Sequence, residues 1–128
     1  MLHTRSVHAT TLELLKQLLS LEQLSNFHLV GGTALALQFG HRISEDIDLF
    51  TQESFSSYEL ERSIFEKLNG ASIAVDMAKK NTLRLRIDYV KVDLLYYPYA
   101  LIDKPLAIDE IRMLSIKDIA AMKLSAVS

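Results

Sequence analysis

The chain has 128 residues, the length of one ordinary domain, and its 49% hydrophobic and 23% charged residues argue against disorder. Its net charge of −2 excludes a globally basic nucleic-acid binder, and the absence of cysteine excludes disulfide scaffolds, thiolate zinc sites and cysteine nucleophiles. No apolar run approaches ~18 residues and no apolar signal core follows the N-terminus, so we expect a cytoplasmic protein without a transmembrane helix.

The first third of the chain alternates helix and strand patterns. A capping box with Thr10 as its cap predicts a helix over about 10–21. The short apolar segment 27–30 predicts a strand, and the segment 33–39, which is apolar all round, predicts a short buried helix. Gly40 is the natural stop of that helix.

The remainder of the chain is rich in strand patterns. Period-two alternation or short apolar runs predict strands at 46–50, 72–77, 83–87 and 91–97. Ser56 opens a predicted amphipathic helix that ends near Gly70, and Ser115 opens a last helix that runs to the end of the chain. We therefore expect an α/β (α+β) fold: a mixed twisted sheet with helices mainly on one face and acidic side chains on the other.

Gly31-Gly32-Thr33 lies between a predicted strand and a predicted helix. Two glycines let the backbone approach a ligand closely, and the N–H groups that open a helix suit a phosphate group. A Gly-Gly turn is more often only a tight turn, so this motif alone does not decide between the two interpretations.

Asp46 and Asp48 flank Ile47 on a predicted strand, so both carboxylates leave one face. Such a pair repels and raises the pKa of its members unless a cation lies between them, and hard oxygen ligands suit Mg²⁺ or Mn²⁺. Two solvated carboxylates on an exposed sheet face are the alternative. Asp93 is a further acid flanked by apolar residues, and a neighbouring strand that brought it to the first pair would complete a two-metal phosphoryl-transfer site.

Lys123 occupies an unusual position in the last predicted helix. At 100° per residue it falls in the middle of the apolar stripe, between Ile119 and Val127. A lysine there either extends past the helix edge to water or meets an anion. The second alternative directs Lys123 toward the carboxylates or toward a bound phosphate.

Three smaller groups each have two interpretations. His41 and Arg42 precede the acids and would contact phosphate or acceptor, or Arg42 would pair with a nearby carboxylate. Arg84 and Arg86 share a strand face and would form either a short nucleic-acid track or a solvated surface. The tyrosines at the end of the strand 91–97 would stack on a base or form core at the sheet edge.

These motifs follow one another in a specific order: apolar strand, Gly-Gly-Thr, helix, Asp-x-Asp, and a third acid between apolar residues. The order resembles the nucleotidyltransferase superfamily with a DNA polymerase β-like core. The wording of segments 31–50 and 118–126 is similar to the AbiEii/AbiGii toxin family of nucleotidyltransferases. The resemblance extends from about residue 8 to residue 128.

The resemblance implies a site and a reaction. It implies that Asp46, Asp48 and Asp93 hold divalent Mg²⁺ or Mn²⁺, that Asp93 helps to deprotonate the attacking hydroxyl, and that Gly31, Gly32, Thr33, Arg42 and Lys123 bind the nucleotide. The reaction would move an NMP from an NTP to a hydroxyl of RNA, tRNA included, or of a protein, and would release pyrophosphate. The toxin branch implies abortive infection and a cognate antitoxin as partner. From the lack of a long apolar run we expect no membrane partner.

The chain ends inside its last predicted helix, whereas members of that family usually continue with further helices. We therefore expect residues 1–128 to be a single nucleotidyltransferase core domain that lacks a C-terminal helical portion. The alternative function is a truncated, catalytically silent module that binds a nucleotide or a protein. A haloacid-dehalogenase-like phosphatase also uses Asp-x-Asp, but the polar residues before Asp46 and Phe50 after the motif do not fit its pattern.

Overall fold

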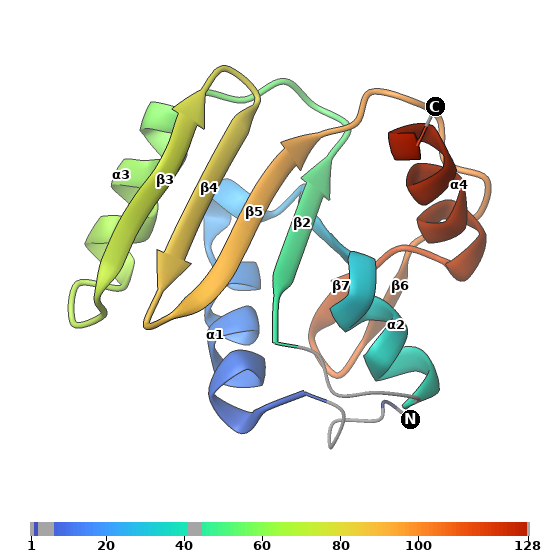
Figure 1. Cartoon of the computed structure of the whole chain (residues 1–128), viewed down its shortest axis with the longest axis horizontal. Helices are drawn as coiled ribbons and strands as arrows, with labels where there is room; N and C mark the ends of the chain where they lie inside the picture. Colours follow the sequence, from blue (N-terminus) through green and yellow to red (C-terminus); the bar gives the residue numbers. More distant parts are fainter. Residues whose placement is uncertain (1, 3–6, 41–44, 128) are drawn as a thin grey trace.

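The computed structural model describes residues 2, 7–40 and 45–127, and for residues 123–127 it describes the backbone alone (Figure 1). In chain order the elements are α1 (Ala9–Leu19), a 3-10 turn η2 (Glu22–Leu24), β1 (His28–Val30), α2 (Gly31–Phe39), β2 (Ile47–Thr51), α3 (Ser57–Lys67), β3 (Ile73–Lys79), β4 (Thr82–Ile87), β5 (Val90–Tyr96), β6 (Leu106–Ile108), β7 (Ile111–Met113) and α4 (Ile116–Val127). In this part of the chain no helix is long and apolar enough to cross a membrane.

The strands form one seven-stranded sheet in the order β3-β4-β5-β2-β1-β7-β6. The pairs β2·β5 and β1·β7 are parallel, and the remaining neighbours are antiparallel. The mixed sheet confirms the predicted fold class. Strand β5 pairs with β4 on one side and with β2 on the other. Because α3, β3 and β4 separate β2 from β5 in the chain, segments distant in the sequence meet at the centre of the sheet.

The two faces of the central strands differ in polarity. In β2, Ile47 and Leu49 are fully buried while Asp48 between them is partly exposed, and β4 alternates buried leucines with exposed Arg84 and Arg86. Helices α1 and α3 lie behind the sheet in Figure 1, whereas α2 and α4 contact each other near its β1–β7 part. The apolar residues form the core, and the charged residues occupy the opposite face, which we call the open face.

Local signals predicted several helix ends correctly. The Ser56 side chain caps α3 by accepting a hydrogen bond of 3.3 Å from the backbone N–H of Glu59. Gly40 ends α2 in the left-handed conformation, with φ of 67°, which costs a glycine little because it has no Cβ. The predicted strands correspond to β1 to β5, with small shifts at their ends.

Other predictions were wrong in detail. The capping box at Thr10 does not open α1: the helix starts at Ala9, His8 precedes it without a side-chain cap, and Thr10 lies inside the first turn. The helix also stops at Leu19, before η2, rather than near Leu21. Strands β6 and β7 were not predicted, because each is only three residues long, too short for a period-two pattern to be distinguished.

Candidate active site

Asp48 and Asp93, which we call the acid pair, meet at the centre of the sheet. They are register partners on the parallel strands β2 and β5. Residues paired across neighbouring strands point to the same face, so both carboxylates lie on the open face. Asp93 is 8% exposed and Asp48 is partly exposed. The pairing confirms that a neighbouring strand brings the third predicted acid beside the Asp-x-Asp motif.

The surroundings of Asp48 disfavour its charged form. Burial raises the pKa of Asp48 to about 6, and the negative charges of Asp93 and Asp46 contribute to the rise. Lys91 and Arg84 act in the opposite direction. The Oδ1 atom of Asp93 is buried and has no hydrogen-bond partner among the described residues. A cation beside these oxygens would relieve both conditions, since it would compensate the charge and occupy the free lone pairs.

Gly31 brings the start of α2 against the acid pair. Its φ is +74°, and a Cβ built on it would lie 2.5 Å from Oδ2 of Asp48. Only glycine combines that conformation with such a close approach. The lack of a side chain at Gly31 thus lets the first N–H groups of α2 lie next to the carboxylate of Asp48. Gly32 follows in the first turn and is partly exposed.

Thr33 lies at the same helix start but is fully buried. Its hydroxyl donates a hydrogen bond to the backbone carbonyl of Asp46. This contact ties α2 to the segment that leads into β2. The sequence suggested Thr33 as a phosphate ligand; the structure instead shows its side chain engaged with the protein backbone.

Asp46 lies one residue before the first residue of β2, and its side chain is exposed. The strand therefore starts one residue later than the predicted 46–50, and the negative charge of Asp46 still acts on Asp48. Within residues 2, 7–40 and 45–122, no three histidine, aspartate or glutamate side chains are grouped so as to hold a metal ion. The structure brings Asp48 and Asp93 together and leaves Asp46 at the margin.

Two predicted site residues cannot be placed at the level of side chains. Arg42, like His41, lies outside the described residues, and only the backbone of Lys123 is described. Lys123 belongs to α4, and α4 contacts α2, the helix that starts at Gly31. The backbone therefore places Lys123 in a helix adjacent to the one that opens at the acid pair.

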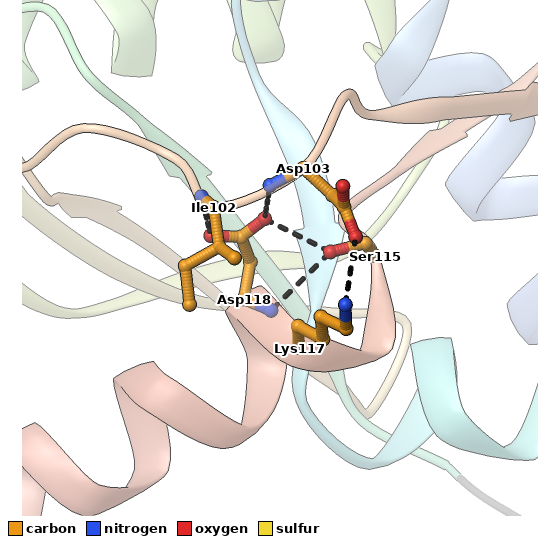
Figure 2. Close-up of polar contacts among 5 residues, drawn as sticks. All are labelled: Ile102, Asp103, Ser115, Lys117 and Asp118. Atoms are coloured by element: carbon orange, nitrogen blue, oxygen red, sulfur yellow. Dashed lines mark hydrogen bonds and ion pairs between the residues drawn. The ribbon is translucent and has the colours of Figure 1, made fainter.

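A second buried carboxylate, Asp118, lies three residues after Ser115, the predicted start of α4 (Figure 2). Its Oδ1 accepts from the N–H of Ile102 at 2.7 Å, and its Oδ2 accepts from the N–H of Asp103 at 3.0 Å and from the hydroxyl of Ser115 at 2.9 Å. Burial alone would raise the pKa of Asp118, but these three hydrogen bonds outweigh it and hold the pKa below its usual value. Asp118 thus joins α4 to the loop before β6.

Sequence reasoning missed this contact because its donors come from a loop without any local pattern. It also overlooked Lys91, which stands two residues before Asp93 on β5 and shares its face. The period-two rule that grouped Asp46 with Asp48 would have found that lysine.

The sequence pattern of a family described as nucleotidyl transferase AbiEii toxin, type IV toxin–antitoxin system, matches residues 13–128. The chain belongs to the AbiEii family. A relative of this AbiEii chain, an uncharacterised protein of Aquifex aeolicus (strain VF5), is 34% identical over 120 residues, which are 91% of this chain and 57% of that protein. The chain thus spans little more than half the length of that relative.

Solved structures share the fold of this AbiEii chain. JHP933 from Helicobacter pylori has a TM-score of 0.67 at 19% identity, over 98% of this chain and 59% of that one. A proposed nucleotidyltransferase from H. pylori has a TM-score of 0.65 at 19% identity, over 91% and 59%. A proposed nucleotidyltransferase from Thermotoga maritima has a TM-score of 0.62 at 21% identity, over 94% and 88%. At these identities the likeness shows the fold alone.

Proposed function

We propose that this AbiEii protein is a metal-dependent nucleotidyltransferase that moves an NMP from an NTP to a hydroxyl of RNA, tRNA included, or of a protein, and releases pyrophosphate. We further propose that it is the toxin of a toxin–antitoxin pair, with a cognate antitoxin as its partner. One observation carries the proposal: the acid pair lies in register beside the glycine-opened start of α2. Membership of the family supports the class of reaction.

The acid pair fits a divalent cation. Asp93 Oδ1 has no donor in the described part of the chain, and the pKa of Asp48 is raised to about 6 by burial and by neighbouring carboxylates. Both features indicate oxygens that gain a favourable partner when a hard cation such as Mg²⁺ or Mn²⁺ binds. Asp48 and Asp93 would hold the metal, with Asp46 as a further ligand. Such an ion supplies charge neutralisation at the phosphoryl oxygens.

The helix start supplies the phosphate contacts. The first N–H groups of a helix have no partners within the helix and attract an anion. In α2 these groups belong to Gly31, Gly32 and Thr33, and the close approach at Gly31 places them beside Asp48. We assign the β- and γ-phosphates of the NTP to them. The hydroxyl of Thr33 keeps α2 fixed to Asp46 rather than binding phosphate itself.

Two cationic residues complete the proposed nucleotide site. Lys123 lies in α4, which contacts α2, and we assign its ammonium group to the triphosphate. Arg42 precedes the acids in the sequence, and we assign it to the nucleotide on that ground alone. A substitution Lys123→Met tests the first assignment, since it should reduce transfer without unfolding the protein.

The chemical step follows from this arrangement. The acceptor hydroxyl oxygen forms a bond to the α-phosphorus, and the bond from that phosphorus to the bridging oxygen of the leaving pyrophosphate breaks. The hydroxyl proton passes to the carboxylate of Asp93, and pyrophosphate leaves with the electron pair of the broken bond. Asp93 suits the role because its Oδ1 is not engaged by any described donor.

The direct test is incubation of the protein with each NTP labelled at the α-phosphate, Mg²⁺, and total RNA or total protein. Label should appear in one acceptor class, and nuclease or protease digestion identifies which. We expect Asp48→Asn and Asp93→Asn to reduce transfer at least about a hundredfold. Asp109→Asn is the matched control, because Asp109 is an exposed carboxylate in the turn between β6 and β7, and it should retain full transfer.

A second readout separates binding from chemistry. Mg²⁺ with an NTP should raise the melting temperature of the wild type and leave that of Asp48→Asn unchanged, since a ligand that binds only the folded state stabilises it. A melting shift without label transfer to any acceptor would favour the silent nucleotide-binding module instead. No shift and no transfer would overturn the proposal.

A further inference from the structure

Two cations lie beside the acid pair on the open face, and neither has an ion-pair partner in the described part of the chain. Arg84 on β4 is the register partner of Asp93, and Lys91 lies two residues before Asp93 on β5, with buried Val92 between them. Both side chains are exposed. Neither forms an ion pair or a hydrogen bond with any residue that the structure describes.

Arg86, on the same strand face as Arg84, does have an ion-pair partner, Asp76. Its Nε donates to Oδ2 of Asp76 at 3.0 Å and its Nη2 donates to Oδ1 at 2.9 Å, so the guanidinium binds the carboxylate in a bidentate manner. Lys91 is the register partner of Arg86 on β5. The sheet therefore neutralises one of three neighbouring cations and leaves Arg84 and Lys91 for another anion.

The acid pair does not form direct ion pairs with Arg84 or Lys91. Arg84 and Lys91 lie close enough to act on Asp48, where both lower the pKa. Yet neither makes an ion pair with Asp48 or Asp93 in the described part of the chain. Because Arg84 does not bind the adjacent carboxylates, its planar guanidinium can donate two hydrogen bonds to a phosphate group. Lys91 adds a positive point charge beside it.

The order of the strands indicates whether Arg84 and Lys91 face the triphosphate of the NTP or a phosphate of the acceptor. Gly31 follows β1, so the proposed triphosphate site lies on the β1 side of the acid pair. Arg84 on β4 and Lys91 on β5 lie on the other side of Asp48, because β5 and β4 follow β2 in the direction away from β1. In phosphoryl transfer the attacking and leaving oxygens lie roughly in line on opposite sides of the phosphorus. Cations on the side away from the leaving pyrophosphate therefore face the acceptor.

We propose that Arg84 and Lys91 bind a backbone phosphate of an acceptor RNA and so guide its hydroxyl to the acid pair. This inference rests on the proposed function and names the acceptor class. RNA is favoured over a protein because it presents a phosphate at every nucleotide, next to whichever hydroxyl reacts. A nucleic-acid contact through two cations also agrees with the net charge of −2, since the patch is local.

The test is binding of a fluorescent single-stranded RNA of about 20 nucleotides, measured by anisotropy without NTP or metal, at several salt concentrations. Arg84→Gln and Lys91→Gln should each weaken binding about three- to tenfold, and each should reduce the slope of log K against log salt by about 0.7. Arg86→Gln is the matched control, because Asp76 already occupies that guanidinium, and it should change binding less than twofold. Asp76→Asn should free Arg86 and tighten binding.

The outcomes separate this inference from the proposed function. Loss of the NTP-induced melting shift in Arg84→Gln, with RNA binding unchanged, would assign the cations to the triphosphate and overturn the inference. Equal loss in all three cation variants would indicate non-specific attraction and would overturn it as well. Competition by an acidic peptide as strong as that by RNA would point to a protein acceptor, against the inference. Because the assay needs no NTP, specific RNA binding supports the inference even if label transfer fails.

Discussion

Two buried carboxylates in this molecule have opposite surroundings. Asp118 is 3% exposed and accepts hydrogen bonds from two backbone N–H groups and from Ser115. Asp93 is 8% exposed, yet its Oδ1 has no donor among the described residues, and its register partner on β2 is another carboxylate. Burial is similar in the two places, so the donors make the difference.

The difference separates a structural acid from a functional one. Folding itself satisfies Asp118, whose charged form is stabilised and whose pKa is lowered. Folding leaves the acid pair unsatisfied, and burial with mutual repulsion raises the pKa of Asp48. Such perturbed acids are typical of functional sites, and in the proposed function a cation and a nucleotide complete this one. Four substitutions at Asp118, Gly31 and Asp48 test this contrast through stability.

The largest effect should follow from Asp118→Ala. The substitution removes the acceptor for Ile102, Asp103 and Ser115 at once, and we expect a loss of about 2–4 kcal/mol in the free energy of unfolding. Asp103→Ala is the control, because its exposed carboxylate lies 3.9 Å from Lys117 and contributes within ~0.5 kcal/mol. Urea denaturation measures both. A loss equal to that of the control would show that Asp118 does not hold the loop.

The contribution of Asp118 should also depend on pH. Its pKa is lowered in the folded protein, so the folded state binds the proton less tightly than the unfolded state, whose value is about 3.9. The stabilisation is therefore present above about pH 4 and disappears as the pH falls through the lower folded value. The stability difference between wild type and Asp118→Asn should shrink over that acidic range.

A smaller loss, about 1–3 kcal/mol, should follow from Gly31→Ala. The new Cβ would meet Oδ2 of Asp48 at 2.5 Å, and φ of +74° is unfavourable for any residue with a Cβ. Gly70→Ala is the matched control, because a Cβ there meets nothing within 4 Å. In the Asp48→Ala background the clash with Oδ2 disappears, and the backbone strain and a contact of 3.3 Å with the Cβ of residue 48 remain. Equal losses in both backgrounds would contradict the close approach of α2 to the acid pair.

The smallest effect has the opposite sign. Because the pKa of Asp48 is about 6 in the folded protein, against 3.8 as its ordinary value, folding is disfavoured as the pH rises from about 4 to 6. Asp48→Asn removes this penalty and should stabilise the metal-free protein by about 1–2 kcal/mol near pH 7.5. The gain should vanish near pH 4, where the carboxyl is protonated in both states. Destabilisation at pH 7.5 would place Asp48 with Asp118 as a structural acid.

Much of the architecture follows from local patterns. The alternation of apolar and polar residues predicted strands β2, β4 and β5, because a strand buried on one face needs that period. Ser56 and Ser115 predicted the starts of α3 and α4, since a hydroxyl at that position caps a helix without help from distant residues. The residues of segments 31–50 and 118–126 also indicated the AbiEii family, which the match over residues 13–128 shows.

Tertiary structure decided the site. Which strand neighbours β2 is a long-range choice, and the parallel pairing with β5 is what unites Asp48 with Asp93. The Thr33 hydroxyl at the start of α2 is likewise engaged by a segment distant in sequence, the backbone carbonyl of Asp46. The loop donors of Asp118 are equally non-local. Local sequence determines periodicity and caps through neighbours along the chain, whereas burial, charge coupling and unsatisfied oxygens depend on contacts between segments that meet only in the folded protein.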